Sequence, residues 1–166
     1  MELPLYNVEK MQFKRKPKSI PPTLRPLYVV SLLAIVLKVS SRGEKASIAK
    51  LQLFYWVLQD IENRGEILTS PYSKRDIIRF SPFVNRALIY GEAIGIFEIV
   101  TDKSQFVLTE KGDQWVNKII NEDTIFLNEL AFLAKIRKSF SEKNVDQILK
   151  GGFENEVDFT DIKDIN

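Results

Sequence analysis

The sequence predicts a mainly α-helical fold with a small β-hairpin (α+β), and residues 81–120 carry most of the evidence. Ser81 and Pro82 are typical of a helix start, because serine caps the first turn and proline lacks an N–H that would go unused there. Apolar residues then recur at steps of three and four until Gly95, a typical stop. Two short β-rich segments follow, and Thr109 opens another helix. Helix, hairpin and helix in this order predict a winged helix-turn-helix domain.

The chain is divided by composition into four parts. Four prolines and a basic cluster mark residues 1–22 as an extended basic arm. The winged-helix domain is predicted over 23–121 and a C-terminal helical extension over 122–150, followed by an acidic tail at 151–166 that we expect to be flexible. The predicted helices cover about 26–40, 46–61, 72–80, 82–94, 109–120, 123–138 and 141–150, with strands at 96–100 and 105–108, and loops around 63–65 and 69–71.

Two of these helices are unusually apolar. The segment PLYVVSLLAIVLKV is apolar nearly all round, which predicts a central helix buried on several sides. The helix at 46–61 carries more bulk than one apolar stripe holds, including Phe54 and Trp56. Either this helix is covered on two sides, the alternative that core composition favours, or these aromatic side chains face a partner protein.

Composition excludes several kinds of chemistry. The 166 residues include no cysteine and no histidine, which removes disulfides, thiolate nucleophiles, Cys/His zinc sites and Ser–His–Asp triads. Gly151–Gly152 lacks the context of a phosphate-binding loop, and the aspartates of the tail lack the pattern of a calcium loop. We therefore expect a non-enzymatic protein without cofactor, metal or small-molecule substrate. The longest apolar run, 27–37, is shorter than the ~20 residues of a membrane span, and no signal peptide is recognisable, so a cytoplasmic protein is expected.

Charge is distributed unevenly although the net charge is only +2. Residues 1–26 carry a net +4 and residues 141–166 a net −4. These ends are either solvated termini or arms that meet different partners or each other. The N-terminal arm combines apolar anchors with cations, as docking peptides do, although it could equally fold back over its own domain. The candidate partner-binding residues are Leu3, Leu5, Tyr6, Phe13, Lys14, Arg15 and Lys16 of the arm, together with Phe54 and Trp56.

Nucleic-acid binding by the predicted wing has limited support. The outward face of the helix before the hairpin should carry Asn85, Arg86, Ile89 and Glu92, and acidic residues offset the cations. The candidate nucleic-acid contacts are Lys74, Arg75, Arg79, Arg86 and Lys103. This is a thin basic footprint, so direct DNA contact is expected to be weak or indirect.

The segments RPLYVVSLLAIVLKVSSRGEKASIAKLQLFYWVL, FSPFVNRALIYGEAIGIFEI and VLTEKG resemble a known family. They are similar to the winged-helix middle component of bacterial ABC-three-component systems, which include the Lamassu-type anti-phage defence systems. The resemblance covers about residues 25–120. It implies a non-catalytic adaptor subunit in an antiviral defence complex, linking an SMC/ABC-type ATPase to an effector nuclease that acts on foreign DNA. The alternative function is a winged-helix DNA-binding transcriptional regulator.

Overall fold

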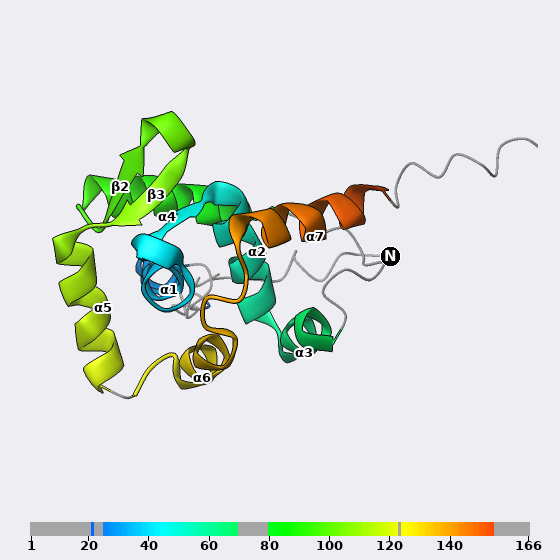
Figure 1. Ribbon diagram of the computed structural model, residues 1–166. Helices are drawn as coiled ribbons and strands as arrows, with labels where there is room; N and C mark the ends of the chain where they lie inside the picture. Colours follow the sequence, from blue (N-terminus) through cyan, green and yellow to red (C-terminus); the bar gives the residue numbers. More distant parts are fainter. Residues whose placement is uncertain (1–20, 22–24, 70–79, 123, 155–166) are drawn as a thin grey trace, which may run out of the picture.

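The computed structural model describes residue 21 and residues 25–69, 80–122 and 124–154. This part of the chain forms helices and a small antiparallel sheet that lies to one side of them, and all of its buried apolar residues belong to one core (Figure 1). The elements are α1 (Pro26–Ser40), η3 (Arg42–Glu44), β1 (Lys45–Ser47), α2 (Ile48–Gln59), α3 (Ile61–Thr69), α4 (Pro82–Ala93), β2 (Phe97–Val100), η4 (Thr101–Lys103), β3 (Gln105–Leu108), α5 (Glu110–Glu122), α6 (Leu127–Ile136) and α7 (Glu142–Glu154). Within the described residues, no helix has the length and apolar character needed to cross a membrane.

Helix α1 is the central element, as its sequence predicts. Every residue from Val29 to Leu37 is buried. Helices α2, α4, α5 and α6 and strand β3 all pack against α1, and Figure 1 views this helix close to its axis with its neighbours around it. The polar side chain within this run, Ser31, accepts a hydrogen bond from Trp115 Nε1 of α5 at 3.0 Å. A helix without a polar face is thus stable because other elements cover it on several sides.

The three strands lie in the order β1-β3-β2, and both neighbouring pairs are antiparallel. Strands β2 and β3 form the predicted hairpin. Strand β1 differs from the prediction, which assigned Ala46 and Ser47 to the second helix. Ala46 pairs with Phe106 of β3, and the Ser47 hydroxyl caps α2 by accepting from the Lys50 N–H at 3.1 Å. Helix α2 therefore begins at Ile48.

The predicted boundaries around α4 are confirmed. The Ser81 hydroxyl accepts from the Phe83 N–H, and Pro82 occupies the first turn. Gly95, with φ +75°, ends the helical segment in the left-handed region that glycine tolerates best. Thr109 Oγ1 accepts from the Gly112 N–H at 3.0 Å and so caps α5.

Two predicted interruptions are helical instead. Asn63–Arg64–Gly65, predicted as a loop, lies within α3, which Asp60 caps by accepting from the Glu62 N–H at 3.1 Å. Gly151–Gly152, predicted to end the last helix, lies within α7, so this helix crosses the predicted boundary at residue 150. The predicted helix at 72–80 falls mainly outside the described residues, and Phe80 is not helical.

The C-terminal extension does not form a core of its own. Phe132, Leu133 and Ile136 of α6 and Val145 and Ile148 of α7 are buried in the same core as α1. Helix α6 packs on α1, and α7 packs on α2. The predicted domain at 23–121 and the predicted extension at 122–150 therefore share a single core.

Glycine positions test this packing. A Cβ at Gly112 would overlap the Ile96 carbonyl oxygen and lie 2.8 Å from Leu108 Cδ1, whereas a Cβ at Gly65 would meet nothing within 4 Å. Gly112→Ala should lower the free energy of unfolding by about 1–3 kcal/mol, since the α5–sheet contact must shift. Gly65→Ala should raise it by about 0.5–1 kcal/mol, because alanine loses less backbone entropy in a helix. Urea denaturation of both variants and the wild type measures these changes in the free energy of unfolding. A destabilised Gly65→Ala variant would contradict the position of this residue within α3.

Candidate functional site

The outward face of α4 combines one cation with an exposed apolar side chain. Asn85, Arg86, Ile89 and Glu92 are all exposed, as the helical periodicity predicts. Ile89 is 68% exposed, a high value for so large an apolar group. The Arg86 guanidinium lies 5.9 Å from the centre of the Phe83 ring on the same helix. The exposed isoleucine suits a protein contact, whereas the arginine, held beside the Phe83 ring, suits a base or phosphate contact.

Asn85, the other candidate for reading a base, is partly engaged in the structure. Its side-chain oxygen accepts a hydrogen bond of 3.1 Å from Gln52 Nε2 of α2. Gln52 is 2% exposed, and its side-chain oxygen also accepts from the Ser81 N–H at 2.8 Å. The buried amide of Gln52 thus fixes the first turn of α4 against α2. This fixed polar contact positions the α4 face relative to the core.

The hairpin beside α4 adds more negative than positive charge. Glu98, Asp102 and Lys103 are exposed, and so are Ile99 and Val100 of β2, at 38% and 37%. From 81 to 108 the chain carries two basic and three acidic side chains. We call the exposed residues of α4 and of the adjacent strand β2, taken together, the α4–hairpin face. It presents apolar area with little net charge, which is a poor match for a phosphate backbone.

A shallow apolar groove lies at the start of α1. It has a volume of about 400 Å³ and is lined by Leu27, Tyr28, Ser31, Ile125, Phe126 and Glu129. The Tyr28 and Phe126 rings in its lining contact each other, with centroids 4.9 Å apart. An adjoining hollow of about 570 Å³ extends past Leu27 to Tyr90 of α4. Leu27, Tyr90 and Ile125 are each more than 40% exposed, so this surface is accessible.

Glu129 at the edge of this groove is held by an ion pair. Its carboxylate accepts from Arg64 Nη2 of α3 at 2.7 Å, and the same nitrogen donates to the Leu58 carbonyl at 2.8 Å. Both side chains are largely buried, so the pair is less screened than a surface pair. Burial raises the pKa of the neighbouring Tyr28, and the Glu129 charge raises it further. The groove is therefore built on a fixed contact between α3 and α6.

A buried lysine joins the end of α1 to the chain before α7. Lys50 of α2 is 3% exposed, and its Nζ donates to the carbonyls of Ser40 at 3.1 Å and Phe140 at 2.8 Å. Burial lowers the pKa of Lys50. The charge of Glu142 partly offsets this by raising the pKa, and the charge of Arg42 lowers it further. Close by, the Glu142 carboxylate accepts from the Ser47 hydroxyl at 2.6 Å and from its N–H at 3.2 Å. We call this cluster the Lys50 junction.

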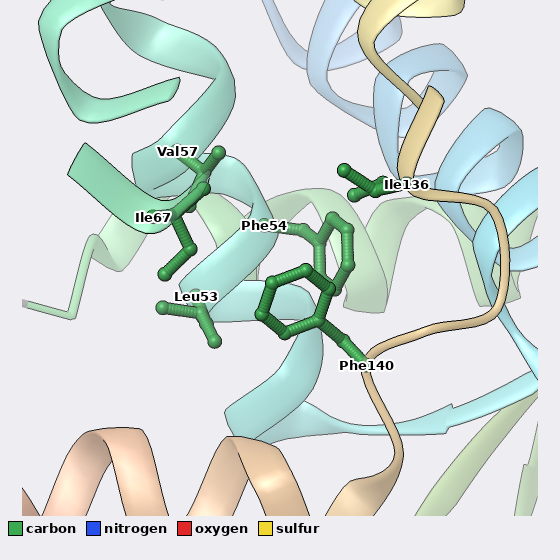
Figure 2. A pocket seen from close by; sticks show the side chains of 6 residues that line it. All are labelled: Leu53, Phe54, Val57, Ile67, Ile136 and Phe140. Atoms are coloured by element: carbon green, nitrogen blue, oxygen red, sulfur yellow. The ribbon is translucent and has the colours of Figure 1, made fainter. Parts of the chain in front are cut away.

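The predicted aromatic partner surface is only partly available. Phe54 is 2% exposed and packs edge-on against Phe140, with ring centroids 5.9 Å apart. Figure 2 shows these two rings with side chains from α2, α3 and α6 in an apolar seam. Phe54 is therefore a core residue, and its proposed role in binding a partner is wrong. Trp56 is partly buried against the core.

Of the remaining predicted site residues, the structure describes some, and the others lie outside the described residues. Arg86 and Lys103 are exposed, and their role as nucleic-acid contacts stays a prediction. Leu3, Leu5, Tyr6, Phe13, Lys14, Arg15, Lys16, Lys74, Arg75 and Arg79 lie outside the described residues. The sequence reasoning missed Lys50, Arg64 and the groove. A lysine within the mostly apolar helix α2 was a signal for the first, whereas the other two depend on contacts between distant segments.

Comparison with known proteins found no relative of this chain. No protein-family model, curated protein or solved structure matches the chain. Among the described residues, acidic side chains do not gather in a group of three or more that could hold a metal ion.

The Lys50 junction gives a pH-dependent prediction. Because burial lowers the folded-state pKa of Lys50 below its ordinary value of 10.5, the unfolded chain binds more protons between these two values. The stability of the wild type relative to Lys50→Met should therefore rise with pH in this window and stay constant below it. At neutral pH, Lys50→Met should cost about 1–3 kcal/mol, since two carbonyls lose their donor. Urea denaturation of both proteins from pH 7 to 10.5 provides the measurement, and a difference that falls with pH would contradict a lowered pKa. Taking the difference between the two proteins cancels the titration of Tyr28 and Tyr55.

Proposed function

We propose that the chain is a winged helix acting as a non-catalytic adaptor in a cytoplasmic complex. The strand order β1-β3-β2 supports the fold assignment, with β1 between α1 and α2 and the hairpin directly after α4. In this arrangement α4 takes the place of the recognition helix and β2–β3 that of the wing. The resemblance to the middle component of ABC-three-component systems supports the adaptor role. On that basis the partners are an SMC/ABC-type ATPase and an effector nuclease of an antiviral defence system.

The α4–hairpin face is the observation that carries this proposal. A helix that reads DNA needs cations around it to hold phosphates, whereas this face has fewer basic than acidic side chains. Its exposed apolar members, Ile89, Ile99 and Val100, are instead the type of residue that a protein partner buries. Strand β2 is also an edge of the sheet, so its outer side is available for pairing with a partner strand.

The groove at the start of α1 supports the adaptor role independently. An adaptor needs at least two contact surfaces, and the groove supplies apolar area apart from the hairpin. Its floor is fixed by the Arg64–Glu129 pair and by the aromatic contact of Tyr28 with Phe126. A pre-formed surface loses little entropy on binding, which favours affinity.

A DNA-binding regulator is the second candidate, and one observation favours it. Arg86 is exposed on α4 next to Asn85, and arginine and asparagine are the side chains that most often read guanine and adenine. Under this alternative the chain should bind one duplex sequence as a homodimer. Arg86 would then be essential.

Two variants on neighbouring turns of α4 separate these functions. Ile89→Glu should lower recovery of the ATPase and nuclease with the tagged chain from its native host by at least about tenfold, since it places a charge in an apolar contact. Arg86→Glu should leave this recovery nearly unchanged. Both side chains are exposed, so the unfolding free energy should change by no more than about 0.5 kcal/mol, which a thermal melt checks.

The regulator predicts the opposite result. Arg86→Glu would then abolish sequence-specific duplex binding, and the wild type would be recovered as a dimer with DNA and without an ATPase. Equal partner recovery from both variants and the wild type would remove the α4–hairpin face from the adaptor proposal.

A further inference from the structure

Five exposed cations lie within three residues, along the chain, of the contacts that join the end of α1 to the start of α7. Lys50 Nζ joins the Ser40 and Phe140 carbonyls, which brings the segment after α1 against the connector between α6 and α7. Figure 1 shows this connector running past α1 before it enters α7. Arg42 lies two residues after Ser40, and Arg137 and Lys138 lie three and two residues before Phe140. The Lys50 junction therefore brings basic segments that are distant in sequence to the C-terminal end of α1.

The second contact of the junction adds two more cations. Ser47 donates through its hydroxyl and its N–H to the Glu142 carboxylate, so β1 is fixed to the first turn of α7. Lys45 lies two residues before Ser47, and its side chain runs over Gly43. Lys143 follows Glu142 directly. Together with Arg42, Arg137 and Lys138, these two lysines form a surface that we call the basic end.

The charge of the basic end is largely uncompensated. Its five members are all exposed. The segments 42–50 and 135–143 carry seven basic and two acidic side chains. Of the two acids, Glu44 is paired with Lys38 at 2.7 Å and Glu142 is bound to Ser47. The buried ammonium of Lys50 beneath adds to the positive potential.

We propose that the basic end binds the phosphate backbone of a nucleic-acid duplex without reading its sequence. Phosphate contacts need several cations on an accessible surface, and they supply most of non-specific DNA affinity. An acidic protein partner fits less well, because protein interfaces centre on apolar anchors. Among the exposed large apolar residues of the described chain, Ile48 is the one that falls in these segments.

The basic end and the apolar groove lie at opposite ends of α1. The groove lies at the first turn of α1 and the basic end just beyond its last turn. A 15-residue helix is about 22 Å long, so the two surfaces are separated by roughly that distance. A protein partner in the groove and a duplex at the basic end can therefore be bound at the same time. The inference does not depend on the identity of the proposed protein partners.

Fluorescence anisotropy of the full chain with a random-sequence DNA duplex tests the inference. If about five phosphates are neutralised, the logarithm of the binding constant should fall against the logarithm of salt with a slope of about −4 to −5. The charge-reversed variant Arg42→Glu/Lys45→Glu/Lys138→Glu should bind at least about tenfold more weakly in low salt and show a smaller slope. The neutral variant with glutamine at these positions should show an intermediate loss. A thermal melt of each variant confirms that it folds.

The matched control is Arg25→Glu/Lys111→Glu/Lys118→Glu, which changes three exposed cations elsewhere by the same total charge and leaves the candidate nucleic-acid contacts of α4 and the hairpin in place. It should retain most of the duplex binding. Equal losses in both triple variants would overturn the inference, because the effect would then follow net charge alone. A loss below about twofold in the basic-end variant would assign binding to other parts of the chain and overturn it as well. Tighter binding of a polyglutamate peptide than of the duplex, abolished by the same variant, would replace the nucleic acid with an acidic protein.

Discussion

Helix α1 has no polar face, and the arrangement of the other elements follows from this. From Val29 to Leu37 each side chain is buried, so α1 is stable in water only when neighbours cover its whole circumference. Helices α2, α4, α5 and α6 and strand β3 provide that cover. The core is therefore built by segments distant in sequence, and the C-terminal helices belong to it. Removing any of these neighbours would expose apolar area on α1, which costs about 25 cal/mol for each Å².

Polar side chains then determine how the covering elements are joined. Lys50, Gln52 and Arg64 each reach main-chain carbonyls or side chains of another element at 2.7–3.1 Å. Burying such groups without hydrogen bonds is unfavourable, so the contacts that they make favour one relative position of the elements. Apolar contacts alone tolerate small sliding movements. The contacts of Lys50 fix the connector before α7, those of Gln52 fix the start of α4, and those of Arg64 fix α6 beside the groove.

Local sequence signals predicted the elements whose boundaries depend on neighbouring residues. The buried helix α1, the cap and proline of α4, the stop at Gly95 and the cap of α5 at Thr109 were all predicted in this way. Strand β1 could not be predicted, because three residues become a strand only by pairing with β3, about 60 residues later. Helix α3 was misread since Asn63–Arg64–Gly65 is turn-like in isolation, whereas burial of Ile67 and the bonds of Arg64 favour a helix.

The candidate surfaces also differ in whether local sequence could predict them. Arg86 and Ile89 could be assigned to the outer face of α4 because helical periodicity gives the direction of each side chain. The groove and the basic end could not, since each combines segments about 95 residues apart that only the folded core brings together. Phe54 illustrates the opposite error. Its size suggested a partner contact, but the arrival of Phe140 from the connector covers its ring within the same chain.

These contacts also account for the kind of recognition that the described part of the molecule suits. Its most firmly held polar groups, those of Lys50, Gln52, Arg64 and Glu129, bind to other elements of the same chain. The surfaces that remain accessible are broad and shallow, and they differ in character between apolar area at one end of α1 and positive charge at the other. Broad surfaces bind macromolecules through summed area and charge, whereas small ligands need converging polar groups in a deep cavity. Because the shared core fixes both ends of α1, a partner bound at one end would be held at a defined distance from a partner at the other. Such spacing is what the proposed adaptor role would require.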